Sequence, residues 1–194
     1  MRVLLVETRF PSPLFYAREE PLALEIVAGS LVDHDVRILD MRLDEDLEGA
    51  LKSFEPDVVA TNGVTAQVYR AKALLARVKA LLPHVRTVIG GQHATLLPED
   101  FHAPFVDAVV LGPGEFTMPE LLRAWETGAD PRSVAGLALP VDGRQFRTVP
   151  RFVKDLDAAP PPRRDLTATY RSRYFQELHR PAAMARTSLG CNNR

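Results

Sequence analysis

The sequence has little cysteine, almost no net charge and no long hydrophobic run. One cysteine in 194 residues excludes a disulfide framework and makes the cytoplasm the expected compartment. No segment approaches the ~18 consecutive apolar residues of a membrane-spanning helix, and the first residues turn polar too early for a signal peptide. A net charge of −1 gives no general attraction to nucleic acid or anionic membranes. We therefore expect no nucleic-acid partner and no membrane span.

Two common phosphate-binding motifs, GxGxxG and GxxxxGK[ST], are also absent. The first apolar run leads into Glu7-Thr8-Arg9-Phe10-Pro11, which has no glycine, so a nicotinamide dinucleotide site is disfavoured. The same loop lacks the hydroxyl-rich character that binding of the FMN phosphate would require. The third apolar run ends at Asn62, where a phospho-acceptor domain would carry an aspartate. These absences disfavour nicotinamide dinucleotide binding, FMN binding and a phospho-acceptor function.

What the sequence does contain is five short apolar runs that alternate with helical patterns. The predicted strands cover residues 3–6, 36–39, 58–60, 87–89 and 109–111. Helical spacing is clearest where Val68, Ala71, Leu75 and Val78 recur at steps of three and four residues. This alternation predicts an α/β fold with a doubly wound, flavodoxin-like, five-stranded parallel sheet. Right-handed crossovers favour the strand order 2-1-3-4-5.

Loops of small residues follow the third, fourth and fifth predicted strands. Because the carboxyl ends of parallel strands meet at one edge, these loops should form a continuous rim where a ligand can approach the backbone. The predicted binding residues are Thr61, Asn62, Gly63, Val64, Thr65, Gly90, Gly91, Gln92, His93, Gly112, Gly114 and Glu115. The helix after the last loop should start with a capping box formed by Thr117 and Glu120.

After Gly128 the pattern changes. Residues 134–141 and 145–149 flank Asp142-Gly143, which predicts a β-hairpin with a two-residue turn. The run Pro160-Pro161-Pro162-Arg163-Arg164-Asp165 is typical of a stiff linker without regular structure. A short helix is expected over residues 170–179.

These motifs together resemble the cobalamin-binding domain of cobalamin-dependent radical S-adenosylmethionine enzymes. The three loops carry the resemblance, and the hairpin, the proline-rich linker and the closing Thr187-Ser188-Leu189-Gly190-Cys191 resemble that family's connection into its catalytic barrel. The resemblance implies three parts. Residues 1–128 would form a Rossmann-like cobalamin-binding domain, 129–165 a hairpin and linker, and 166–194 the start of a truncated radical S-adenosylmethionine domain.

The resemblance also implies which groups do what. Cobalamin would lie across the carboxyl ends of the strands. Residues 61–65 would face the corrin, and Gly90, Gly91, His93 and the loop 112–115 would contact the nucleotide tail and the ring amides. In the full-length parent, Cys191 would be the first ligand of a four-iron four-sulfur cluster that binds S-adenosylmethionine. This chain itself would contain no catalytic residue, because a CxxxCxxC cluster needs three thiolates.

The chain departs from the family pattern at two further points. The usual GEGE stands here as Gly112-Pro113-Gly114-Glu115, so one glutamate contact is missing. The DxHxxG pattern, by which another cobalamin group supplies a histidine to cobalt, is absent, and His93 is therefore not assigned as an axial ligand. Two other functions stay open: the nucleotide-sugar domain of a glycosyltransferase-like enzyme, and a non-catalytic flavodoxin-like interaction domain.

Overall fold

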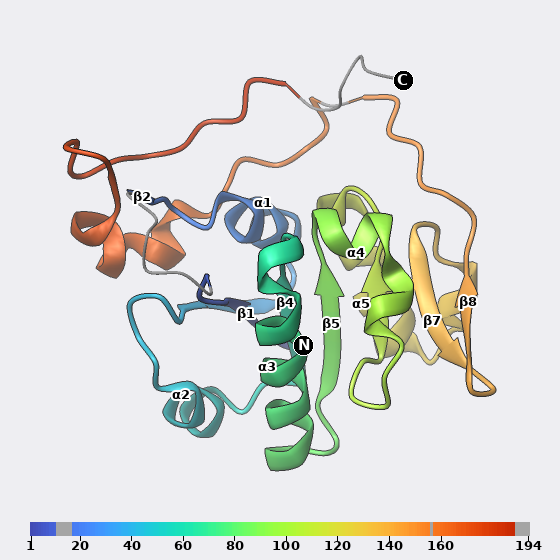
Figure 1. Ribbon diagram of the computed structural model, residues 1–194. Coiled ribbons are helices and arrows are strands. Elements are labelled where there is room, and N and C mark those ends of the chain that lie inside the picture. Colours follow the sequence, from blue (N-terminus) through green and yellow to red (C-terminus); the bar gives the residue numbers. More distant parts are fainter. Residues whose placement is uncertain (11–16, 156, 189–194) are drawn as a thin grey trace.

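The computed structural model of the chain (Figure 1) describes residues 1–10, 17–155 and 157–188. Its main sheet has seven strands in the order β3-β1-β4-β5-β6-β7-β8. The strands are β1 (Arg2–Glu7), β3 (Asp35–Asp40), β4 (Val58–Asn62), β5 (Arg86–Gly90), β6 (Ala108–Val110), β7 (Leu137–Val141) and β8 (Arg144–Arg147). The five strands β3 to β6 in this order are parallel, whereas β7 and β8 are antiparallel. The predicted order 2-1-3-4-5 is confirmed for the parallel strands.

Helices cover both faces of this sheet. The α-helices are α1 (Leu22–Ser30), α2 (Leu47–Phe54), α3 (Val68–Leu81), α4 (Gln92–Leu96) and α5 (Gly114–Thr127). Short 3₁₀ helices are η1 (Thr65–Gln67), η2 (Pro98–Phe101), η3 (Pro131–Ser133) and η4 (Arg164–Arg173). Helices α1 and α5 pack on one face in a single apolar cluster, and α2, α3 and α4 pack on the other. The chain therefore forms three layers, as the doubly wound prediction required.

The sequence of β1 explains its central place in the sheet. Val3 and Leu5 pack in the cluster with α1 and α5, while Leu4 and Val6 pack in the cluster with α2 and α3. All four side chains are at most 1% exposed. An unbroken apolar run thus serves both faces, because successive strand residues point in opposite directions.

The hairpin prediction is confirmed, and the hairpin also extends the main sheet. Asp142 and Gly143 both have positive φ angles, of 48° and 70°, as a type I′ turn requires. Strand β7 pairs with β6, and Leu137 and Leu139 are buried in the same cluster as α5. Hairpin and parallel sheet therefore share one core.

The predicted capping box at Thr117 and Glu120 is wrong. Helix α5 already begins at Gly114, so Thr117 lies inside it, and its side chain is fully buried. Arg151 donates from Nε to Thr117 Oγ1 at 2.7 Å and from NH1 to Glu120 Oε1 at 3.0 Å. The two residues hold the segment that follows the hairpin, which sequence spacing alone could not reveal.

The predicted helix over residues 170–179 is also wrong, and the linker is regular from Arg164 onward. Helix η4 covers Arg164–Arg173, and β9 (Phe175–Gln176) then pairs antiparallel with β2 (Ala17–Arg18). Tyr174 between them is extended and fully buried. Its burial against the main body outweighs the local helical pattern.

Candidate functional site

A cavity of about 680 Å³ opens at the carboxyl ends of the parallel strands, between the sheet and helices α1 and α5. Its floor is formed by side chains of β1, β4, β5 and β6, including Leu5, Ala60, Val88 and Val110. The loops after β4, β5 and β6 form its rim. The lining is largely apolar, with polar groups gathered at the strand ends. Such a combination suits a ligand with an apolar body and a few fixed hydrogen-bonding groups.

The rim is shaped by a close approach of two loops. Gly63 N donates to Gly90 O, and His93 N donates to Gly63 O, both at 3.3 Å. Gly91 adopts φ 95° and ψ −175°, a conformation essentially restricted to glycine. A Cβ at Gly91 would lie 2.9 Å from Gly63 N. The backbone can therefore pass here only because residue 91 has no side chain.

Side chains of the rim also connect neighbouring loops. Thr95 Oγ1 donates to Gly91 O and accepts from Gly112 N, each at 2.9 Å. This threonine ties the loop after β5 to the loop after β6. Gly114 begins α5 so close to α1 that an added Cβ would lie 3.2 Å from Val27 Cγ2. The cavity mouth is thus set by hydrogen bonds on one side and by helix packing on the other.

Asn62 carries an unmet hydrogen-bonding group into this site. Its Oδ1 is buried and has no hydrogen-bond partner among the described residues, and the residue lines the cavity. A buried oxygen without a donor costs about 1–3 kcal/mol. By contrast, the neighbouring Thr61 Oγ1 donates to Val6 O at 2.7 Å. The position of Asn62 favours a ligand that brings an N–H or O–H donor.

His93 has a different environment from the cavity residues. It is 5% exposed, with Nδ1 3.1 Å from Thr65 Oγ1 and Nε2 2.8 Å from Asp100 Oδ2. Its ring packs edge-to-face against Phe101 at 5.8 Å. Both ring nitrogens are therefore occupied by protein groups, which leaves none free to bind a metal.

The C-terminal segment returns to this edge of the molecule. After β8 it passes α1 and forms η4 next to α1 and β3, at the end of the sheet opposite to β8 (Figure 1). Arg163 N donates to Glu25 O at 2.9 Å, and Thr167 Oγ1 donates to Glu25 Oε1. Further along, Arg186 NH2 donates to Glu115 Oε1 at 2.9 Å. The segment thereby adds a wall to the cavity, because Arg186 is one of its lining residues.

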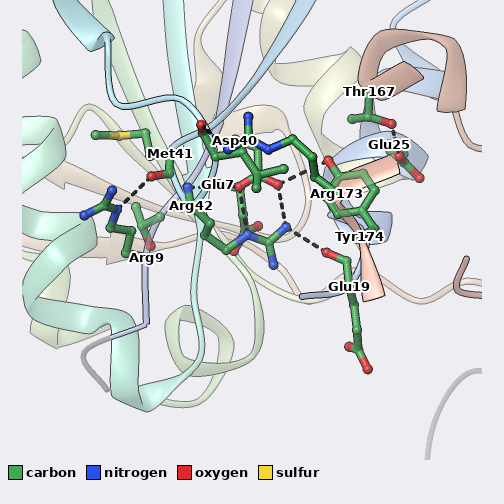
Figure 2. Close-up of polar contacts among 12 residues, drawn as sticks. Glu7, Arg9, Glu19, Glu25, Asp40, Met41, Arg42, Thr167, Arg173 and Tyr174 are labelled. Carbon is green, nitrogen blue, oxygen red and sulfur yellow. Dashed lines mark hydrogen bonds and ion pairs between the residues drawn. The ribbon is translucent and has the colours of Figure 1, made fainter. Parts of the chain in front are cut away.

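A second polar cluster lies beside the cavity, at the carboxyl ends of β1 and β3 (Figure 2). Arg42 forms two hydrogen bonds with Asp40, at 2.8 and 2.6 Å, and donates to Glu19 O. The Tyr174 hydroxyl donates to Asp40 Oδ2 at 3.2 Å. This cluster fastens the C-terminal segment to the sheet, since Tyr174 belongs to that segment.

The electrostatics of this cluster are dominated by burial. Burial raises the pKa of the Glu7 carboxyl to about 7, although the Arg42 guanidinium and a hydrogen bond from Gln67 act in the opposite direction. Burial also raises the pKa of Tyr174, and the Asp40 carboxylate raises it further. The Glu7 carboxyl therefore loses its proton only near pH 7, and the Tyr174 hydroxyl stays protonated throughout the neutral range.

Comparison with known proteins identifies the family. The B12-binding domain family matches residues 15–122, more than half of the chain. The chain belongs to the B12-binding domain family. This confirms the resemblance stated from the loop motifs, and cobalamin is the cofactor that the domain binds.

Curated relatives are longer than this domain. An uncharacterized methyltransferase of Pyrococcus horikoshii is 31% identical in an alignment of 179 residues that covers 88% of this chain and 38% of that protein. The anaerobic magnesium-protoporphyrin IX monomethyl ester cyclase of Cereibacter sphaeroides is 30% identical over 138 residues, covering 66% of this chain and 22% of that enzyme. The chain thus spans well under half the length of these relatives.

Solved structures share the fold. The cobalamin-dependent S-adenosylmethionine radical enzyme OxsB, with aqua-cobalamin and S-adenosylmethionine bound, superimposes with a TM-score of 0.76 at 18% identity, over 88% of this chain and 25% of OxsB. The radical S-adenosylmethionine methyltransferase TsrM from Kitasatospora setae gives 0.66 at 22% identity, over 83% of this chain and 31% of TsrM. The arrangement of layers and strands is common to all three.

The structure of the B12-binding domain brings together eight of the twelve predicted binding residues. Those that line the cavity are Thr61, Asn62, Gly90, Gly91, Gln92, Gly112, Gly114 and Glu115. The other four, Gly63, Val64, Thr65 and His93, lie outside the lining. Of these, Gly63 and His93 hold the rim by the backbone bonds described above.

Sequence reasoning missed several lining residues. Ala23, Ile26 and Val27 come from α1, Met118 from α5 and Arg186 from the C-terminal segment. In the sequence, the helical spacing of Leu24, Val27, Ala28 and Leu31 marks an apolar stripe. Such a stripe does not show that a space remains between helix and sheet. Nothing near Arg186 in the sequence points to Glu115, which is 71 positions away.

Neither a metal site nor a membrane-spanning helix occurs among the described residues. In residues 1–10, 17–155 and 157–188, no group of three or more ligating side chains could hold a metal ion. No helix in the described part of the chain is long and apolar enough to cross a membrane. Cys191, the predicted iron–sulfur ligand, lies outside the described residues.

Proposed function

We propose that this domain holds cobalamin across the carboxyl ends of β1, β4, β5 and β6, with the nucleotide tail of the cofactor inserted into the cavity beside α1. The cavity itself carries the proposal: it is about 680 Å³ in volume, largely apolar, and bordered by glycines that expose backbone. The tail combines an aromatic base with a sugar and a phosphodiester. An apolar slot with polar groups at its mouth suits that combination.

The residues present fit this cofactor. The buried Asn62 Oδ1 lacks a donor, and the corrin carries amide side chains that can supply one. Around Gly112, an added Cβ would meet no atom within 4 Å, so the backbone there is open to a ligand. Of the four predicted residues outside the lining, Gly63 and His93 hold the rim in place through their backbone hydrogen bonds. Because both ring nitrogens of His93 contact protein groups, this histidine is not among the residues that would hold the cofactor's cobalt.

The activity belongs to a longer protein. When bound, cobalamin supplies a cobalt centre that can carry a methyl group or assist a radical step. The domain's own residues bind and orient the corrin and exclude water from the tail. A radical S-adenosylmethionine barrel in cis, with a four-iron four-sulfur cluster starting at Cys191, would supply the catalytic residues. In this proposal residues 1–128 form the cofactor domain, 129–165 the connection and 166–194 the beginning of the barrel. The enzyme would act in the cytoplasm.

A titration with hydroxocobalamin tests the proposal. The visible spectrum of the corrin should change saturably on addition of folded protein. Ala23→Trp should weaken binding by about tenfold or more, equivalent to about 1.4 kcal/mol, because it fills the cavity entrance from α1. Ala23 is exposed, so the fold should tolerate the larger side chain.

Ala80→Trp is the matched control, since Ala80 is an exposed alanine on α3 and does not line the cavity. Its affinity should equal that of the wild type. A wild-type protein that leaves the hydroxocobalamin spectrum unchanged, or an Ala23→Trp variant that binds normally, would contradict the proposed site.

A further inference from the structure

Two cavities meet at the base of α5. The first is the largely apolar cavity described above, and the second, of about 440 Å³, lies between α1, the start of α5 and the C-terminal segment. They share Ile26, Glu115 and Arg186. The second cavity also contains Arg164, Asp157 and Ser188, so its lining is more polar. A ligand that enters the apolar cavity would meet charged groups at this junction.

Arg186 is well placed to act on such a ligand. Its guanidinium makes one hydrogen bond in the described part of the chain, to Glu115 Oε1 at 2.9 Å. A guanidinium has five N–H donors, so most remain available. Among the described residues that line the first cavity, Arg186 is the one basic group and Glu115 the one acidic group. Without Arg186 the cavity wall would carry a buried negative charge.

We propose that Arg186 is an anion-binding residue of this site and donates hydrogen bonds to the phosphodiester of the cobalamin tail. The inference rests on the proposed function. A phosphodiester leaving water requires charge-assisted donors, which guanidinium groups supply well. The carboxylate of Glu115, 6% exposed, would repel the phosphate unless the same guanidinium neutralised it. Glu115 in turn can accept from a hydroxyl of the ribose.

This assignment links cofactor binding to the C-terminal segment. Arg186 reaches the cavity from residues that lead toward Cys191, and the same segment is fastened upstream by Arg164, which forms an ion pair with Glu20 and donates to Met184 O. An occupied tail site would add a further attachment point at Arg186. The segment would therefore be held more firmly with cofactor bound than without it.

The test compares two corrinoids in the full chain. Hydroxocobalamin carries the nucleotide tail, whereas cobinamide keeps the corrin but lacks the nucleotide and its phosphodiester. Arg186→Gln should weaken hydroxocobalamin binding about tenfold or more and change cobinamide binding less than about twofold. Arg186→Lys, which keeps the charge, should recover part of the affinity. Arg147→Gln removes an exposed arginine on β8 and should bind both corrinoids normally.

Other results would overturn the inference. If Arg186→Gln binds hydroxocobalamin normally, Arg186 does not contact the tail, and the proposed function stands without it. If it weakens both corrinoids equally, the residue acts on the corrin or on cavity shape. If Glu115→Gln restores hydroxocobalamin affinity in the Arg186→Gln background, Arg186 acts only by neutralising Glu115. A wild-type chain that binds cobinamide but not hydroxocobalamin refutes the tail site, and one that binds neither refutes the proposed function as well.

Discussion

Replacing Gly91 with alanine tests the geometry of the cavity rim most directly. The residue adopts φ 95° and ψ −175°, and placing a side chain in that region costs about 1–3 kcal/mol. The new Cβ would also lie 2.9 Å from Gly63 N and 3.0 Å from Gly63 O. Because these atoms are backbone, they can yield only if the loops after β4 and β5 separate.

The separation would break two hydrogen bonds, Gly63 N to Gly90 O and His93 N to Gly63 O. At about 1 kcal/mol each, their loss adds to the backbone strain. We expect Gly91→Ala to lower the free energy of unfolding by about 3–5 kcal/mol, measured by urea denaturation with linear extrapolation. Cobalamin affinity should also fall, because Asn62, the last residue of β4, directly precedes the displaced loop.

Gly112→Ala is the matched control. Gly112 has φ 78°, but an added Cβ would meet nothing within 4 Å, so the substitution imposes backbone strain of about 1–2 kcal/mol without a clash. Gly91→Ala should therefore be the more destabilising of the two by at least about 1 kcal/mol. Equal free energies of unfolding for the two variants would refute the reasoning that the loops touch at Gly91.

Three further substitutions test the second polar cluster and the linker. Glu7 keeps its proton to about pH 7 when folded, against an ordinary pKa of 4.5. The unfolded chain therefore ionises first, so stability should fall by roughly 3 kcal/mol as pH rises from 4.5 to 7, and Glu7→Gln should flatten this dependence in urea denaturation. Tyr174→Phe removes the bond to Asp40 and should cost about 1 kcal/mol, with faster proteolysis of the C-terminal segment. Gly29→Ala would favour an isolated helix by about 1 kcal/mol, but here a Cβ would lie 2.3 Å from Pro161 O, so thermal denaturation should show a loss of stability.

Glu7→Gln and Tyr174→Phe have matched control substitutions, and for all three variants one result would contradict the expectation. Glu48→Gln changes an exposed glutamate and should leave the pH dependence of stability intact. If the free energy of unfolding of Glu7→Gln fell with pH as steeply as that of the wild type, Glu7 would not be the group responsible. Leu178→Ala alters a side chain that is 98% exposed and should leave proteolysis unchanged. Similar cleavage rates in Tyr174→Phe and wild type would mean that the tyrosine does not hold the segment. A more stable Gly29→Ala variant would show that the linker does not lie against α1.

Local sequence signals were sufficient for the parallel sheet and the hairpin. The doubly apolar run of β1 can only be buried on both faces, and Asp142-Gly143 is one of the few dipeptides that adopt a type I′ turn readily. Patterns of this kind depend on neighbours within a few residues. The elements that they predict therefore form in the folded chain with little change.

Local signals failed where distant contacts decided the outcome. Thr117 and Glu120 have the spacing of a capping box, but Arg151 engages both side chains instead. Residues 170–179 look helical, yet burying Tyr174 against the sheet requires an extended backbone at that point. In each case a contact across more than 30 positions outweighs a local preference of a few tenths of a kcal/mol.

The sequence by itself determined the layers, the strand order and the three small-residue loops. The spacing of hydrophobic residues and the composition of a loop depend only on residues that are close together in the sequence. The sequence also predicted Gly91 as a binding residue, and Gly91 lines the cavity. Only the tertiary structure decided how deep the site is. The space beneath α1, the unpaired oxygen of Asn62 and the arrival of Arg186 at Glu115 all depend on how separate elements pack. A cavity remains where side chains from distant parts of the chain do not fill the space between helix and sheet. No single stretch of sequence specifies how far apart these elements lie.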